Sequence, residues 1–175
     1  VYGLTQLKVE NSFINYFRAD TEIHKGMKLI DNQLGGTTPM DILIKFKDDT
    51  YNGEIDEEFD ELLGADEASD ESNWFTTEKI NKIKYIHDYL DDNKYIGKVL
   101  SLASSIRVAE IVNDDKELNS LEMSLLYKQL PNEVKDIAVN PYLSIKDNEA
   151  RINIRVLDSN KDLRRAALIE SITTD

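Results

Sequence analysis

The spacing of apolar residues predicts a helix followed by a strand in the first third of the chain. Four apolar side chains recur four, three and four residues apart, as on one buried face of a helix: Ile23, Met27, Ile30 and Leu34. Asp20 or Thr21 is the expected N-cap, because either side chain can accept a hydrogen bond from a free backbone N–H. Apolar and polar residues then alternate over 40–47, which is the period of a half-buried strand.

A glycine pair and a proline separate these two elements. Gly35 and Gly36 can adopt the left-handed conformation that ends a helix, since neither carries a Cβ atom. Pro39 fixes its own φ angle and holds the preceding residue extended. A phosphate-binding loop would follow a strand and open a helix, whereas the stretch Gly35-Gly36-Thr37-Thr38 follows a helix. The pattern therefore favours a structural turn.

The middle of the chain predicts a helix and a second strand. Thr76 or Thr77 is the expected cap of a helix whose buried face comprises Ile80, Ile83, Ile86 or His87, and Leu90. Residues 95–101 are typical of a strand. Within that strand, Gly97 indicates a bulge or the close approach of another segment.

Two helices are predicted after this strand. The first covers about 103–112 and is expected to use Ile106, Ala109 and Val112 as its apolar residues. The second covers about 119–130. Asn119 and Glu122 stand at the spacing of a capping box, and Pro131 ends the helix.

The clearest strand alternation lies near the end of the chain. There the apolar residues Ala150, Ile152, Ile154 and Val156 alternate with Arg151, Asn153 and Arg155. Asp158, Ser159 and Asn160 are candidate caps for a final helix with Leu163, Ala166, Ala167 and Ile169 or Leu168. Well-separated strands that alternate with helices favour an α+β fold, in which helices cover one face of a sheet. A chain of 175 residues suits one domain or two small lobes, and we expect a single domain over 1–175.

Residues 51–73 differ from the rest of the chain in composition. Ten of the eighteen residues from Glu54 to Glu71 are Asp or Glu, and none is basic. We interpret this stretch as a solvated insert within the domain. A calcium-binding EF-hand loop needs a glycine at its sixth position, and neither 56–61 nor 66–71 supplies one.

Composition and charge exclude several classes of function. The formal net charge of −13 argues against binding to nucleic acid or to an anionic membrane surface, since both require a basic face. The chain has no cysteine, so neither a disulfide framework nor a thiolate metal site can form. No apolar run approaches the ~20 residues of a membrane-spanning helix. The chain opens on Val1 without a signal-peptide pattern, and we expect a processed protein or a domain excised from a longer one.

Candidate catalytic groups are few. His24 and His87 each lie beside an apolar helical stripe and lack a second ligand at metal-binding spacing, so each is expected to be structural or solvent-exposed. The G-x-S-x-G motif of a serine hydrolase is absent around the four serines of residues 101–120: Ser101, Ser104, Ser105 and Ser120. The sequence therefore assigns no catalytic, cofactor-binding or metal-binding residue, and it predicts that the chain is not an enzyme.

Several segments, taken in order, resemble a known family. They are Thr21 to Met27, Ile30-Asp31, Leu34-Gly35-Gly36-Thr37-Thr38-Pro39-Met40-Asp41, Val99 to Ala103, Asn140-Pro141-Tyr142-Leu143, Ala150-Arg151-Ile152, and Arg155 to Arg165. Together they are similar to the region after the first membrane helix in bacterial exporters of the resistance-nodulation-division (RND) superfamily. The branch concerned includes the MMPL-type lipid exporters and is related to the Patched-like proteins. The acidic stretch between Gly53 and Asn73 lies outside the resemblance.

The resemblance implies an extracytoplasmic porter domain, held between the first two membrane helices of an exporter in the inner membrane. The domain would face the periplasm of a double-membraned bacterium and adopt a ferredoxin-like split β-α-β sheet. Its expected partners are the other porter domain, the membrane helices, neighbouring protomers or periplasmic proteins, and a hydrophobic or lipid-like cargo. Energy coupling in the family relies on ionisable residues inside membrane helices, which this segment does not include. No cofactor is implied, and no substrate-binding residue is assigned.

A second hypothesis comes from the acidic stretch. The chain would then be a free-standing interaction module that binds a basic partner or divalent cations through residues 54–71. Calcium would raise the melting temperature of such a module by mass action.

Overall fold

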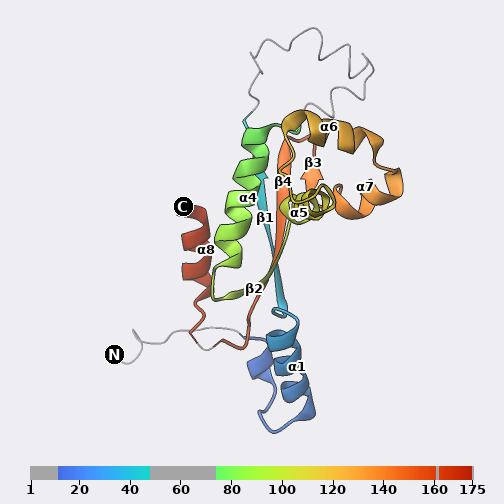
Figure 1. Ribbon diagram of the computed structural model, residues 1–175. Helices are drawn as coiled ribbons and strands as arrows, with labels where there is room; N and C mark the ends of the chain where they lie inside the picture. Colours follow the sequence, from blue (N-terminus) through green and yellow to red (C-terminus); the bar gives the residue numbers. More distant parts are fainter. Residues whose placement is uncertain (1–11, 48–73, 161, 175) are drawn as a thin grey trace. The chain divides into compact units, whose positions relative to one another are not determined.

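A computed structural model describes residues 12–47, 74–160 and 162–174 (Figure 1). The described chain mixes helices with an antiparallel sheet and is an α+β fold, as the sequence predicted. Its elements, in order, are η2 (Ile14–Tyr16), α1 (Glu22–Gln33), β1 (Thr38–Lys45), α4 (Thr77–Asp91), β2 (Ile96–Leu100), α5 (Leu102–Val112), α6 (Ser120–Gln129), α7 (Asn132–Ala138), β3 (Leu143–Ser144), β4 (Glu149–Val156) and α8 (Arg165–Thr174). The predicted acidic insert at 51–73 lies outside the described residues.

The sheet has the strand order β1-β4-β2, and β3 pairs with β4. In that last pair, Leu143 lies opposite Ala150 and Ser144 lies opposite Glu149. The predicted alternation of β4 is confirmed: Ala150, Ile152, Ile154 and Val156 are buried, whereas Arg151 and Arg155 are exposed. One face of β4 therefore contributes to the core, and its other face is polar.

The described residues form two compact units, which we treat separately. Unit 1 contains residues 12–40, 93–98, 154–160 and 162–174. Unit 2 contains residues 41–47, 74–92 and 99–153. The division falls within β1, β2 and β4, so each of these strands contributes to both units.

The core of unit 2 includes the predicted buried face of α4. Thr76 is the N-cap, and its side chain accepts a hydrogen bond from the N–H of Lys79. The buried side chains of this helix are Ile80, Ile83, His87 and Leu90, as their spacing predicted. Local rules sufficed here because an amphipathic helix has one way to bury its apolar stripe.

The other helices of unit 2 follow the sequence less closely. The capping box of Asn119 and Glu122 opens α6 as predicted. Pro131 ends that helix and is also the N-cap of α7, which the sequence did not predict. On α5, Ile106 is buried, but Val112 is 82% exposed and was wrongly placed among the packing residues. Val112 is the last residue of α5, and its neighbour Ile111 is exposed as well.

The expected orientation of α1 is wrong. Thr21 caps the helix as predicted. However, Ile23, Ile30 and Leu34 are about half exposed, and the single fully buried residue of the helix is Asp31. The helix turns its polar Asp31 side inward because that carboxylate receives hydrogen bonds there.

The start of the last helix also differs from its prediction. Asp158, Ser159 and Asn160 do not cap α8, which begins at Arg165. Leu163 is buried but precedes the helix, and Leu168 rather than Ile169 is the buried residue of the pair. In the short helix η2, Phe13 occupies the N-cap position without a side-chain hydrogen bond, and the neighbouring Ser12 donates to the Asp158 carboxylate.

Candidate functional site

Unit 1 is organised around the buried carboxylate of Asp31. Its Oδ1 accepts hydrogen bonds from Thr37 N at 2.8 Å, from Thr37 Oγ1 at 2.7 Å and from Asp158 N at 3.1 Å. Its Oδ2 accepts one from Ser159 N at 2.7 Å. The side chain is fully buried. A single carboxylate therefore joins α1, the start of β1 and the segment after β4.

A second buried carboxylate, Asp158, continues this network. Its Oδ2 accepts hydrogen bonds from Ser12 Oγ at 2.9 Å and from Ile14 N at 3.3 Å. Its Oδ1 forms an ion pair with the guanidinium group of Arg165 at the start of α8. We refer to Asp31, Thr37, Asp158, Ser159 and Arg165 as the Asp31 junction.

Glycines bring backbone segments of unit 1 into close contact beside this junction. Gly35 and Gly36 have φ angles of 79° and 106°, as their place in the predicted turn required. A Cβ atom on Gly36 would lie 2.5 Å from the carbonyl oxygen of Val156. A Cβ atom on Gly97 would lie 2.7 Å from the backbone of Gly35, so the predicted close approach at Gly97 is confirmed. Only residues without a side chain fit at these places.

The hydrogen bonds of the Asp31 junction favour a structural role, in which one carboxylate holds three segments of the chain together. A hydrogen bond to a charged group contributes about 1.5–3 kcal/mol, and a buried carboxylate without partners is costly. Acid–base catalysis requires a carboxyl group that can reach a substrate. The Asp31 side chain is instead fully enclosed and hydrogen-bonded on both oxygens.

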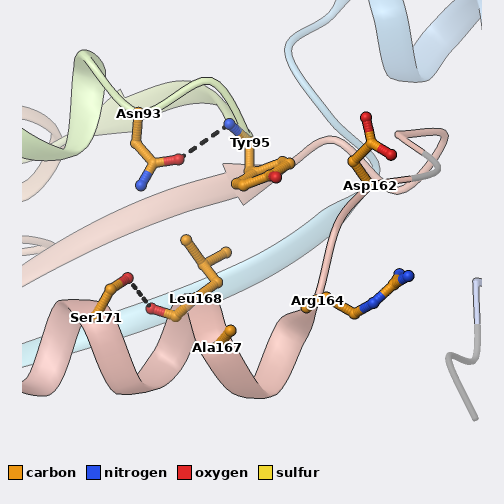
Figure 2. Close-up of a pocket in the computed structure, with 7 residues that line it drawn as sticks. All are labelled: Asn93, Tyr95, Asp162, Arg164, Ala167, Leu168 and Ser171. Carbon is orange, nitrogen blue, oxygen red and sulfur yellow. Dashed lines mark hydrogen bonds between the residues drawn. The ribbon is translucent and has the colours of Figure 1, made fainter. Parts of the chain in front are cut away.

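A cavity of about 200 Å³ opens between the start of β2 and α8 in unit 1 (Figure 2). Tyr95 and Leu168 line its middle, with Asp162 and Arg164 at one end. At the other end, Asn93 Oδ1 accepts from Tyr95 N at 3.0 Å, and Ser171 Oγ donates to Leu168 O at 2.8 Å. The cavity is smaller than the ~300–1,000 Å³ of typical ligand pockets, so it suits at most a small group or the end of a chain.

The two histidines occupy different environments. His24 lies on α1, where its Nδ1 is 3.1 Å from the carbonyl oxygen of Ile14. His87 is buried on α4, with Nδ1 2.8 Å from Ser101 Oγ. Burial lowers the pKa of His87, and the positive charge of Arg107 lowers it further. Ser101 Oγ accepts from Ala103 N–H, which leaves its own proton to donate to a neutral imidazole.

We predict that His87 makes the stability of unit 2 depend on pH. Its pKa is lowered from the usual 6.5. Below pH 6.5 the unfolded chain therefore binds a proton that the folded chain does not. The free energy of unfolding consequently decreases as the pH is lowered. The slope is at most about 1.4 kcal/mol per pH unit until the lowered pKa is reached. Urea titrations between about pH 7 and pH 5 measure it.

The control for this prediction is the other histidine. His87→Asn is expected to remove the slope in this pH range, whereas His24→Gln is expected to retain it. A slope that survives His87→Asn would show that another group is responsible.

The candidate serines have local structural roles. Ser101 caps α5, and Ser104 completes a capping box with it. Ser105 Oγ donates to Ala138 O at 2.6 Å, and Ser120 Oγ accepts from Thr77 N at 2.9 Å. A nucleophilic serine needs a neighbouring base and access to substrate. Ser101 has the base in His87, but its side chain is fully buried, so it cannot reach a substrate.

In unit 2, Asn148 connects the residues just before the acidic stretch with those just after it. Its Nδ2 donates to the carbonyl oxygens of Phe46 and Lys47. Its Oδ1 accepts from Trp74 Nε1 at 2.9 Å and from Lys79 Nζ at 3.0 Å. The rings of Phe46 and Trp74 also meet edge to face, 5.6 Å apart. Through Asn148, Lys47 and Trp74 are therefore linked by hydrogen bonds, and these are the described residues on either side of 48–73.

We predict that residues 54–71 can be replaced by a short Gly-Ser linker without loss of the fold. Both flanks are already held by Asn148, and the entropy cost of closing a flexible loop changes only slowly with its length. Thermal melting is expected to remain cooperative, with a change in Tm of a few degrees at most. By contrast, Asn148→Ala should lower the free energy of unfolding by about 2 kcal/mol, because it leaves buried groups without partners. Loss of a cooperative melt in the linker variant would overturn the insert interpretation.

Neither a metal site among the described residues nor a similar known protein assigns a function to this chain. Within the described ranges, no three His, Asp or Glu side chains come together as a metal site. None of the helices in the described part of the chain combines the length and the apolar character needed to cross a bilayer. Comparisons with protein-family models, with curated proteins and with solved structures found no match to this chain.

Proposed function

We propose that this chain is a periplasmic porter domain of a proton-driven exporter of the RND superfamily, on the MMPL and Patched-like branch. The domain would form part of the route for hydrophobic or lipid-like cargo and would have no enzymatic activity of its own. Its partners would be the second porter domain and the inner-membrane helices of the same exporter. Periplasmic proteins or neighbouring protomers would be further partners.

The observation that carries this proposal is the meeting of the resembling segments at the Asp31 junction. The residues involved are distant in sequence but adjacent in unit 1: Asp31, Gly36 and Thr37 from the first segments, and Val156, Asp158, Ser159 and Arg165 from the last. A chance resemblance would be expected to fall on residues without a common structural role. Here it falls on buried or half-buried residues that contact one another in unit 1.

The strand order also supports the proposal. β4 lies between β1 and β2, while α4 follows β1 and precedes β2 along the chain. Two strands joined through a helix, with an antiparallel strand inserted between them, form the split β-α-β arrangement. We therefore include a ferredoxin-like, porter-type sheet in the proposal.

The exposed apolar side of α1 fits a domain that works within a larger assembly. Ile23, Ile30 and Leu34 lie on one side of this helix and are each about half exposed. Grouped apolar residues on a surface commonly mark contacts with other proteins or with membranes.

The parent gene provides the first test. The proposal requires an apolar segment of about 20 residues shortly before Val1 and several more after Asp175. A complete reading frame that lacks such segments would refute it. In the complete exporter, Gly36→Ala is expected to abolish efflux of a hydrophobic dye, whereas Gly26→Ala should retain it, because Gly26 has no neighbour within 4 Å of an added Cβ.

The alternative function rests on the acidic composition of residues 54–71, where ten of eighteen residues are carboxylates. A free-standing module that binds divalent cations would show a higher Tm in millimolar calcium, and the linker variant would lose that increase. The exporter proposal expects no such increase. An unchanged melt in calcium would exclude specific calcium binding.

A further inference from the structure

Within the part of unit 2 that the structure describes, one edge of β1 has no neighbouring strand. β1 stands at the end of the strand order, with β4 as its one neighbour among the described strands. The N–H of Phe46 donates to Asn148 O at 3.0 Å, which turns the backbone groups of even-numbered residues towards β4. Successive residues point these groups in opposite directions, so those of Asp41, Leu43 and Lys45 point away from β4. In the described ranges, none of these three residues takes part in a backbone hydrogen bond of a turn or loop, so no described turn or loop hydrogen-bonds to this edge.

The side chains of the same three residues lie on the polar face of the sheet. Asp41 accepts from Asn153 Nδ2 at 2.7 Å and pairs with Arg151, and the bonds from Arg151 and Asn153 hold the pKa of Asp41 below its usual 3.8. Lys45 Nζ lies 3.1 Å from Glu149 Oε1. Between them, Leu43 is 65% exposed.

We propose that two copies of this chain associate through β1, antiparallel and centred on Leu43. In this register Leu43 meets Leu43 of the second copy. Asp41 of each copy meets Lys45 of the other, which makes two complementary charge pairs. The facing backbone groups of these residues would hydrogen-bond as in any antiparallel pair, and the two sheets would become one. The inference uses residues of unit 2 alone and does not depend on the proposed function.

The sequence of β1 selects this register over its neighbours. A shift by two residues places Leu43 opposite Asp41 or Lys45 and loses both Asp41–Lys45 pairs. The one shift that brings Asp41 opposite Lys47 uses a residue beyond the end of β1. A shift by one residue would place the outward-pointing backbone groups of one copy opposite residues whose groups point towards β4, so they could not hydrogen-bond. Edge strands are commonly protected by proline or lysine. Here Pro39 lies beyond the three facing pairs, and Lys45 receives a carboxylate partner.

The charge pattern across the joined sheets also alternates. Following the ion pairs, the order is Glu149, Lys45, then Asp41 and its diagonal partner Arg151 of the second copy, which is negative, positive, negative, positive. Each new pair would be exposed and each contact short, so we expect a weak dimer that depends on concentration.

Sedimentation equilibrium of the 175-residue chain tests the association. The apparent mass is expected to rise from that of the 20.1 kDa monomer towards twice this value as the concentration approaches the millimolar range. Asp41→Lys and Lys45→Asp should each remain monomeric, because each places like charges opposite one another. An equimolar mixture of the two variants should dimerise again, since the two acidic positions of one variant then face the two basic positions of the other. Recovery on mixing cannot arise from a change in the fold of either variant.

Cross-linking tests the register. The chain has no cysteine, so Leu43→Cys introduces a single thiol. Paired residues of this kind lie about 5.5 Å apart between Cα atoms, within the disulfide range of about 4.4–6.8 Å. Oxidation should give a disulfide-linked dimer of Leu43→Cys, whereas Val112→Cys, at an 82% exposed position, should stay largely monomeric. A chain that stays monomeric at all concentrations, or a dimer that survives Asp41→Lys, would overturn the proposal.

Discussion

Asp31→Ala is expected to unfold unit 1 or to lower its free energy of unfolding by at least about 3 kcal/mol. The substitution removes the acceptor for both donors of Thr37 and for the backbone N–H groups of Asp158 and Ser159. Each buried donor left without a partner costs about 1–3 kcal/mol. Amide hydrogen exchange measures the effect in unit 1 directly, since the single tryptophan, Trp74, lies in unit 2.

Asp31→Asn separates the loss of charge from the loss of volume. The amide oxygen can still accept from Thr37, whereas the amide nitrogen would face a backbone N–H that needs an acceptor. We expect a loss of stability smaller than that of the alanine variant. If protection of the amides of α1 and β1 in Asp31→Ala stayed within about 0.5 kcal/mol of the parent chain, the junction would not be the organising element of unit 1.

Gly36→Ala is expected to destabilise unit 1 nearly as much as Asp31→Ala. The new Cβ atom would lie 2.5 Å from the carbonyl oxygen of Val156, and the φ angle of 106° disfavours any residue with a side chain. Relief requires the backbone at β4 to move, so we expect a loss of more than about 3 kcal/mol or failure to fold. Gly97→Ala should behave alike, because its Cβ atom would meet the backbone of Gly35 at 2.7 Å.

Gly26→Ala provides the matched control for these glycine substitutions. Gly26 lies inside α1, and an added Cβ atom would meet nothing within 4 Å. Alanine is favoured over glycine in a helix by about 0.8–1.0 kcal/mol, so this variant should be more stable than the parent chain. Urea unfolding of the three alanine variants side by side tests the contrast. Equal stabilities for Gly26→Ala and Gly36→Ala would contradict the geometry described for the Gly36 turn.

No pattern in the sequence predicted the Asp31 junction. Asp31, Asp158 and Ser159 lie in segments that carry the family resemblance, but the resemblance assigned them no role. Periodicity pointed elsewhere, because it assigned the inward face of α1 to Ile23, Ile30 and Leu34. Hydrophobic spacing cannot predict that a carboxylate is buried, since burial of a charge depends on donors that come from distant parts of the chain.

The sequence by itself determined features whose causes lie within a few neighbouring residues. Thr21, Thr76 and the Asn119–Glu122 pair cap their helices as predicted, because a cap needs only nearby N–H groups. The alternation of β4 and the stripe of α4 also hold, since each has one strongly apolar side.

The tertiary structure alone decided which groups from distant segments meet. It gave α1 its orientation through Asp31, turned Asp158 from a candidate cap into a buried ion-pair partner, and left the Leu43 edge of β1 without a neighbouring strand in the described chain. These outcomes depend on which hydrogen-bond donors, backbone segments and strands from distant parts of the chain lie beside a residue. Such long-range neighbours leave no periodic pattern in the sequence.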